Sequence, residues 1–184
     1  GLFSKGKVEL QTSYTKDDDD RKQGHIQSSF EYDVNESWRL TGGYNRTITD
    51  TYFRRYNVLD VDTSQSFLTS HLTGEYYGNR LYGNATLYNF QSLQEGIRSE
   101  SIPVILPVFN MRYTTKPFTQ QGGIMYSDIN GAFINDRNHF KSNRLSLTQG
   151  VTLPYKTSFG LMTQLSGSVR MDGYSVDTGL TDMG

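Results

Sequence analysis

The chain of 184 residues lacks cysteine and contains only four prolines. Without cysteine, a disulfide framework and a thiolate metal site are excluded. No apolar run approaches the roughly 18 residues of a transmembrane helix, so helical membrane spans are excluded as well. The net charge of −1 argues against a nucleic-acid-binding protein, because a surface that tracks phosphates needs a marked excess of Lys and Arg.

Glycine and aromatic residues are abundant instead, with 18 Gly, 13 Tyr and 10 Phe. This composition is typical of strands and turns, and it does not favour a helical bundle. The first residues, GLFSKGKVEL, do not combine a charged segment with an apolar one, so we do not expect them to form a secretory signal. The composition therefore predicts an all-β protein.

Strict alternation of polar and apolar residues is the strongest pattern in the chain. In GHIQSSFEYDV, residues 24–34, Ile26, Phe30 and Tyr32 fall on one parity and charged or amide side chains on the other, so each face of the strand has its own character. The pattern and the turn residues together predict nine strands, at 5–15, 24–34, 38–46, 64–76, 81–91, 104–114, 122–133, 142–153 and 159–174.

The connections between these strands show a second regularity. Longer polar loops, such as KDDDDRKQ and TITDTYFRRYNVLDVDT, alternate along the chain with shorter turns, such as NES and YGNR. In an antiparallel up-and-down meander every second connection lies at the same end, so one end of the sheet carries the longer loops. Outer-membrane barrels show this alternation of longer loops and shorter turns. Sandwiches with Greek-key crossings have less reason to show it.

Aromatic residues gather next to the ends of the predicted strands, on the apolar parity. Such rings settle at the depth of the lipid headgroups and form the aromatic girdles of a membrane barrel. The girdle predicted beside the shorter turns contains Tyr32, Trp38, Tyr76, Tyr113, Tyr155 and Phe159, and the one beside the longer loops contains Tyr14, Tyr44 and Phe133.

Nine strands cannot close a barrel whose termini lie on the same side, because such a barrel needs an even number. Two open edges in lipid would also leave backbone amides unpaired, at several kcal/mol each. We therefore interpret residues 1–184 as part of one outer-membrane β-barrel domain, an antiparallel up-and-down section that the rest of a larger barrel completes.

Residues that would support catalysis or metal binding are not grouped in the sequence. The carboxylates of Asp17 to Asp20 are consecutive and point in different directions, which favours a solvated loop tip over a cation site. His25, His71 and His139 fall on different elements without an i, i+4 partner. We expect no metal, no cofactor and no enzymatic activity; a membrane lipase that uses a serine with His71 stays open as an alternative.

The most distinctive stretch is DTYFRRYN, residues 50–57. Its Arg54 and Arg55 are suited to bind phosphate groups bidentately between the rings of Tyr52 and Tyr56. The alternative, which we favour, is an ordered loop folded over the mouth of the barrel.

The order and spacing of several motifs resemble the barrel domain of the LptD family, also called OstA, of lipopolysaccharide-assembly outer-membrane proteins. The motifs are NESWRL, TDTYFRRYN, LTSHLTGEYYGNRLYGNATLYNFQ, IPVILPVFNMRY, NRLSLTQGVTLPYKTSFG and SGSVRMDGYSV, over about residues 20–176. The matching positions are Tyr52, Arg54, Arg55, Tyr56, Leu106, Pro107, Arg144, Leu153 and Pro154. They mark the family, and we assign them no chemical role.

This resemblance implies a section of a barrel of about 26 strands. An LptE-like lipoprotein would plug the barrel, and a periplasmic β-jellyroll domain of the same chain would connect it to the periplasmic Lpt bridge and supply lipopolysaccharide. The family's paired cysteines, its jellyroll and the strands of its lateral gate have no counterpart in this sequence.

We therefore expect an integral outer-membrane barrel of a Gram-negative bacterium that delivers lipopolysaccharide to the outer leaflet. Leu68, Leu72 and Leu87 are expected to face lipid. The lumenal side chains expected to contact the plug are Thr69, His71, Thr86 and Arg144. A general porin or ligand-gated transporter, and a secreted carbohydrate-binding β-protein, remain alternatives.

Overall fold

The structure is a computed structural model that describes residues 5–16, 22–49, 52, 66–94, 104–135 and 141–177, without the side chains of residues 104–106. None of the described residues forms a helix that could span a membrane. The strands are β1 (Gly6–Lys16), β2 (Lys22–Asp33), β3 (Trp38–Thr47), β4 (Phe67–Tyr77), β5 (Leu81–Ser92), β6 (Val104–Thr114), β7 (Ile124–Asn135), β8 (Lys141–Lys156) and β9 (Met162–Asp177).

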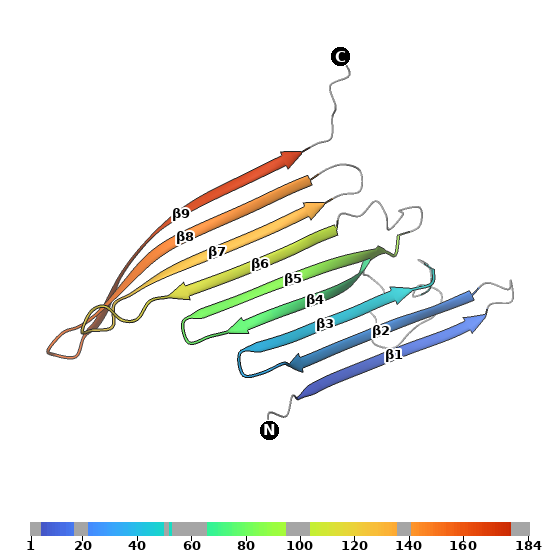
Figure 1. Ribbon diagram of the computed structural model, residues 1–184, viewed down its shortest axis with the longest axis horizontal. Helices are drawn as coiled ribbons and strands as arrows, with labels where there is room; N and C mark the ends of the chain where they lie inside the picture. The colour runs from blue at the N-terminus through green and yellow to red at the C-terminus, as the bar shows by residue number, and fades with distance from the viewer. Residues whose placement is uncertain are drawn as a thin grey trace, which may run out of the picture.

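All nine strands belong to one antiparallel sheet, in the order β1 to β9 (Figure 1). Each strand pairs only with its neighbours in the chain, and β1 and β9 form the two edges of the sheet. The predicted all-β, up-and-down meander is therefore confirmed, and the sheet is open rather than closed on itself.

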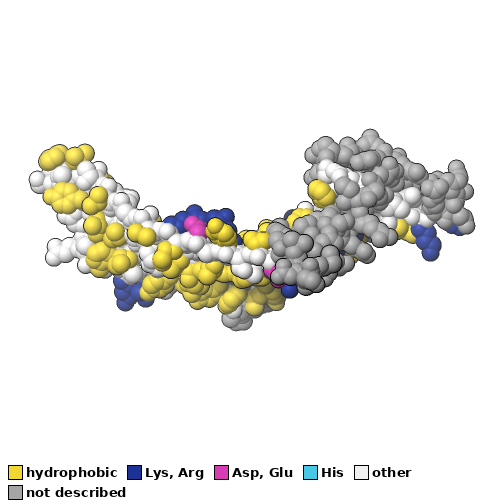
Figure 2. Space-filling view, turned by 90° about the horizontal axis from the view of Figure 1, so that it is seen from above, with side chains coloured by type: hydrophobic (Ala, Val, Ile, Leu, Met, Phe, Trp, Pro, Cys, Tyr) yellow, Lys and Arg dark blue, Asp and Glu magenta, His cyan; other side chains and the backbone are white. Residues whose placement is uncertain are grey.

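The register of the strands divides the side chains between two faces, because directly paired residues of antiparallel strands project to the same side. Figure 2 shows a bowed sheet with hydrophobic side chains along its convex underside and charged side chains in the hollow. The apolar face carries Val8, Phe30, Leu40, Leu72, Leu87, Phe109, Ile129, Leu147 and Met171, and the polar face carries Glu31, Thr41, Thr73, Thr86, Asn110, Asp128, Ser146 and Asp172.

The described residues do not form a second layer over the apolar face. Leu72, Leu87 and Leu145 are 44%, 40% and 51% exposed. Among the described residues, the buried hydrophobic side chains are Tyr52, Leu68 and Leu93. A contiguous apolar surface of this kind marks contact with lipid or with another protein.

The ends of the strands differ from the prediction where proline or a loop intervenes. β4 begins at Phe67 rather than at residue 64, and β8 continues past Leu153 to Lys156. Proline usually interrupts a strand, because it has no N–H group for the ladder. Pro154 is tolerated here because β7 pairs with β8 only as far as Thr152, so that β8 has a neighbour on one side alone.

A β-bulge interrupts β6 at residues 106 and 107, two of the positions that match the family motif. Between Ile105 and Val108 the strand contains one residue more than β7 and one more than β5. A bulge leaves a residue out of the ladder and is one of the few places where proline fits within a sheet. Pro107 therefore occupies a position where its missing N–H group costs little.

The lengths of the connections follow the predicted alternation only in part. The connection between β6 and β7, residues 115–123, lies at the same end as the turns 34–37, 78–80 and 157–161 (Figure 1). It is longer than the connections 17–21 and 136–140 at the opposite end. Its own hydrogen bonds fold it, from Phe118 N to Gly123 O at 2.8 Å and from Gly122 N to Thr119 O at 3.1 Å.

Gly131 and Gly150, like Gly42, let an aromatic ring lie across the neighbouring strand. A Cβ atom on Gly131 would lie 2.2 Å from Phe109 Cε1, on the apolar face. A Cβ atom on Gly150 would lie 2.2 Å from Tyr126 Cζ, on the polar face. Because these distances are far below van der Waals contact, any larger residue has to displace the ring.

We expect Gly150→Val to destabilise the full-length protein by about 1–3 kcal/mol, because the added side chain overlaps the ring of Tyr126. Gly167→Val is the control, since a Cβ atom there meets no atom within 4 Å. Urea unfolding of the two variants in lipid vesicles measures the difference. Equal unfolding midpoints would contradict this account of the ring packing.

Candidate functional site on the polar face

Arginines on the polar face are paired with carboxylates of the same face. Arg112 donates to Asp128, with Nη2 2.7 Å from Oδ2, and its guanidinium lies 5.6 Å from the centre of the Tyr126 ring. Arg39 lies 2.7 Å from Asp33 and 3.1 Å from Glu31. Because the charges neutralise each other locally, they do not form the ring of one sign that an ion filter requires.

Neutral polar side chains form a second set of contacts across β4, β5 and β6. Asn110 Nδ2 donates to Asn84 Oδ1 at 3.1 Å, and Asn84 Nδ2 donates to the hydroxyl of Tyr82 at 2.9 Å. The Tyr82 hydroxyl donates in turn to Glu75 Oε1 at 3.2 Å. The face is therefore lined by groups that can both donate and accept hydrogen bonds.

The four side chains that the sequence predicts for the lumen all lie on the polar face. Thr86 bonds to Thr73 across the β4–β5 pair, with 2.9 Å between the hydroxyl oxygens. The ring of His71 lies over Gly43, 3.1 Å from the position of an added Cβ atom.

Thr69 lies one pair further along the same side of β4. Arg144 is on β8, where its Nη2 atom is 3.5 Å from Asp172 Oδ1. The structure thus brings Thr69, His71 and Thr86 onto adjacent strands and leaves Arg144 three strands away.

Tyr52, from the DTYFRRYN stretch, packs against the polar side of β1 and β2. Its side chain is only 4% exposed, and its hydroxyl contacts Ser13 Oγ and lies 3.4 Å from His25 Nδ1. Ser13 Oγ and His25 Nδ1 are themselves 2.7 Å apart. The centres of the Tyr52 and His25 rings are 5.4 Å apart. We call these three residues the loop anchor.

The backbone leading to the loop anchor is also held by β2. Ile48 N donates to Gly24 O at 2.9 Å, and the hydroxyl of Thr49 donates to Gln23 Oε1. Gln23 is only 1% exposed. The side chain of Tyr52 is thus held on the sheet, and a loop folded over the mouth of the barrel stays a prediction.

The remaining motif residues Arg54, Arg55 and Tyr56 lie outside the described residues. Phosphate binding by the two arginines therefore stays a prediction. In the part of the chain that the structure describes, no group of three His, Asp or Glu side chains is placed to hold a metal ion.

Side chains replace backbone pairing between β3 and β4 near the longer loops, a feature that the sequence reasoning missed. Backbone pairing of these strands ends at Gly43 and His71. Beyond it, Ser70 Oγ accepts from Asn45 N at 3.0 Å and donates to Asn45 O at 3.2 Å. The signal was present in the sequence, because Ser70 is a polar residue on the apolar parity between Leu68 and Leu72.

Gln91 makes a similar pair of bonds from β5. Its Oε1 accepts from Thr47 N at 3.0 Å, and its Nε2 donates to Thr47 O at 2.8 Å. The amide of Gln91 therefore satisfies the two backbone groups that a neighbouring strand would otherwise pair.

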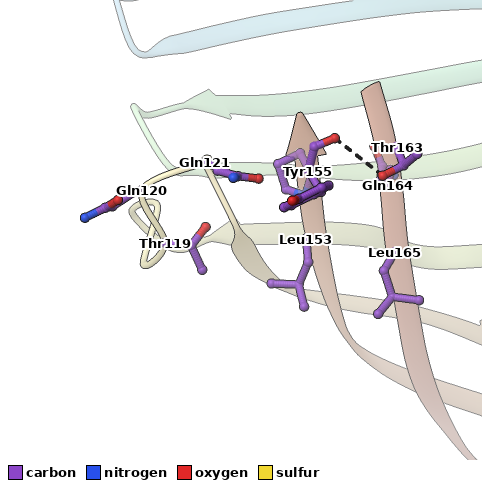
Figure 3. A pocket seen from close by; sticks show the side chains of 9 residues that line it. Thr119, Gln120, Gln121, Leu153, Tyr155, Thr163, Gln164 and Leu165 are labelled. Atoms are coloured by element: carbon purple, nitrogen blue, oxygen red, sulfur yellow. Dashed lines mark hydrogen bonds between the residues drawn. The ribbon is translucent and has the colours of Figure 1, made fainter. Parts of the chain in front are cut away.

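A cleft of about 680 Å³ opens at the opposite end of the sheet, between the connection 115–123 and the β8–β9 hairpin (Figure 3). Gln121 Oε1 accepts a hydrogen bond from Lys156 N at 3.2 Å, which ties the connection to β8. The Thr163 hydroxyl donates to Tyr155 O at 3.4 Å. Glutamine and threonine side chains line this cleft together with Leu153 and Leu165, so it is of mixed polarity and separate from the loop anchor.

We expect Tyr52→Ala to release the loop that follows residue 49, because the substitution removes both the ring and the hydroxyl from the loop anchor. Tyr52→Phe keeps the ring and loses hydrogen bonds worth about 1 kcal/mol. Limited proteolysis of the intact protein within residues 50–65 should be fastest in Tyr52→Ala and intermediate in Tyr52→Phe. The control is Tyr44→Ala, on the exposed apolar face; loop cleavage that does not differ between it and Tyr52→Ala would refute the anchor.

Comparison with known proteins assigns the chain to a family. No curated protein matches it. The model of the LptD family, described as LPS transport system D, matches residues 19–184. The match includes all of β2 to β9 with their connections. An antiparallel all-β meander is consistent with a section of an outer-membrane β-barrel. The chain therefore belongs to the LptD family of lipopolysaccharide transport proteins.

Proposed function

We propose that this chain forms part of the wall of an outer-membrane barrel that inserts lipopolysaccharide into the outer leaflet, without catalysing a reaction. The observation that carries the proposal is the separation of the sheet into an uncovered apolar face and a self-neutralised polar face. In a membrane the first would contact lipid, and the second would line the lumen.

The aromatic residues support this orientation. The register places Tyr32, Trp38 and Tyr113 on the apolar face beside the shorter turns, and all three are exposed. The rings of Trp38 and Tyr76 are 5.0 Å apart on neighbouring strands. Amphipathic rings at this height would sit among lipid headgroups, with the shorter turns in the periplasm.

The polar face suits a protein-filled lumen. A barrel of about 26 strands encloses a wide channel, as in plugged outer-membrane transporters. Hydroxyl and amide groups such as those of Thr86 and Asn110 can bond to a protein plug of the LptE type. Remaining strands would complete the barrel at the edges β1 and β9, and a periplasmic jellyroll domain would connect it to the Lpt bridge.

A barrel wall fits two features of the sheet better than a channel or a soluble sandwich does. An ion-selective channel lines its pore with charges of one sign, whereas Arg39 and Arg112 are each paired with carboxylates. A soluble carbohydrate-binding sandwich needs a second sheet over residues such as Leu72 and Leu145, which are exposed here.

The two faces should respond differently to an added charge. We expect Leu72→Arg to destabilise the membrane-embedded protein by about 2–4 kcal/mol, because it places a guanidinium in hydrocarbon. Thr69→Arg, three residues away on the polar face, should cost far less. Unfolding by denaturant in lipid vesicles measures both values. Similar costs at the two positions would rule out the barrel orientation.

Contact with a plug is testable by photo-crosslinking in the full-length protein. Probes at Thr69, His71 or Thr86 should capture a lipoprotein partner, and probes at Leu72 or Leu87 should capture lipid. Leu68 is not a suitable lipid probe, because it is only 7% exposed although it lies on the apolar face. If the polar-face probes capture no protein and the barrel conducts ions freely, a porin would be the better assignment.

A further inference from the structure

A groove of about 450 Å³ crosses the apolar face between β3 and β6, next to the shorter turns. It follows two cross-strand rows, one through Trp38, Tyr76, Gly83 and Met111 and one through Leu40, Gly74, Ala85 and Phe109. The residues that line it are Trp38, Gly74, Tyr76, Leu81, Gly83, Asn84, Ala85, Phe109, Asn110 and Met111. Its volume is within the range of small-molecule sites in proteins.

The floor of the groove consists of small residues that packing within the sheet does not require. A Cβ atom on Gly83 would lie 3.6 Å from Asn110 O and 3.9 Å from Met111 Cγ, which are ordinary contacts. A Cβ atom on Gly74 would lie 3.6 Å from Leu40 Cδ2. Gly131 and Gly150 lie beneath aromatic rings that fill the space above them. The space above Gly74 and Gly83 is not filled by a ring and stays open at the surface.

The side chains on both sides of the groove are apolar. Trp38 and Tyr76 lie on the β3–β4 side of the groove, Phe109 and Met111 lie on the β6 side, and Leu81 is the lining residue at the start of β5, next to the turn. The side chains of Asn84 and Asn110 bond to each other on the opposite face of the sheet. An occupant with many polar groups would therefore lose hydrogen bonds in the groove, whereas a hydrocarbon chain would not.

Two cationic residues, Arg80 and Lys116, belong to the connections next to this end of the groove. Arg80 directly precedes Leu81, and its carbonyl accepts a hydrogen bond from Thr114 N at 2.8 Å. This bond brings the turn of Arg80 next to the segment that contains Lys116, two residues past Thr114. Both side chains are exposed, and neither has an acidic partner among the residues that the structure describes.

We propose that the groove binds an acyl chain of an anionic glycerophospholipid whose phosphate group contacts Arg80 and Lys116. The chemistry fits both ends of this molecule, because hydrocarbon matches the glycine floor and apolar sides, and a phosphate matches two cations at headgroup depth. The inference rests on the proposed function, which places the apolar face in the membrane and the shorter turns on its periplasmic side.

The test uses the tryptophan in the groove. The full-length protein is placed in phosphatidylcholine vesicles that contain a small fraction of phosphatidylglycerol with brominated acyl chains, which quench tryptophan on contact. The signal of Trp38 is the difference between wild-type protein and Trp38→Phe. We expect quenching well above the proportion of brominated lipid, because that lipid is enriched in the groove.

Substitutions in the groove and at the cations should remove this enrichment. Gly83→Leu fills the floor and should reduce the quenching to that expected from random lipid contact. Arg80→Gln combined with Lys116→Gln should weaken the enrichment on the order of tenfold. Gly167→Leu on β9 is the matched control, since it adds the same side chain to the same face outside the groove.

Two results would overturn the site while the proposed function stands. The first is quenching in proportion to the brominated lipid in every variant. The second is enriched quenching by brominated lipopolysaccharide and not by the phospholipid, which would assign the groove to the transported substrate. Absence of quenching at any lipid composition is a different outcome, because it would remove Trp38 from the membrane and overturn the proposed function together with the site.

Discussion

Pairing of backbone amides between neighbouring strands is the constraint on which the rest of the structure depends. Once the register is set, the period of two assigns every side chain to one face, so the apolar and polar faces arise from the same ladder of hydrogen bonds. The seam between β3 and β4 shows how strong the constraint is. Where backbone pairing ends, the side chains of Ser70 and Gln91 bond to the free amide and carbonyl groups of Asn45 and Thr47. These side-chain bonds satisfy backbone groups that would otherwise have no partner strand.

Glycine serves two opposite purposes in this sheet, and both depend on the absence of a side chain. At Gly131 and Gly150 the space is filled by a ring from the next strand, which adds contact area to an otherwise thin single layer. At Gly74 and Gly83 the space stays open and shapes the surface of the apolar face. Whether a glycine is covered by a ring or leaves a groove therefore depends on its position relative to the aromatic residues of the neighbouring strands.

The sequence predicts the number, order and faces of the strands because alternation is a local property that each segment carries by itself. It does not predict features that depend on which residue of one strand meets which residue of another. The contact of Tyr52 with Ser13 and His25 joins segments that lie far apart in the chain. Likewise, alternation places Arg144 on the polar face, but only the β8–β9 register brings it to Asp172. The match to the LptD family says more about the function of the chain than the two faces of the sheet or the register of its strands.

The bulge in β6 divides that strand into two segments with different phases of alternation. Ile105, an odd-numbered residue, and Val108, an even-numbered one, both pair with even-numbered residues of β7, Ile134 and Ala132. Exchanging the residues at the bulge leaves both phases intact. Deleting one of them would merge the phases, and one half of the strand would have to turn its apolar-face residues toward the polar face. The number of residues at the bulge is thus constrained more tightly than their identity, so that the residues at positions 106 and 107 act as a spacer within the strand.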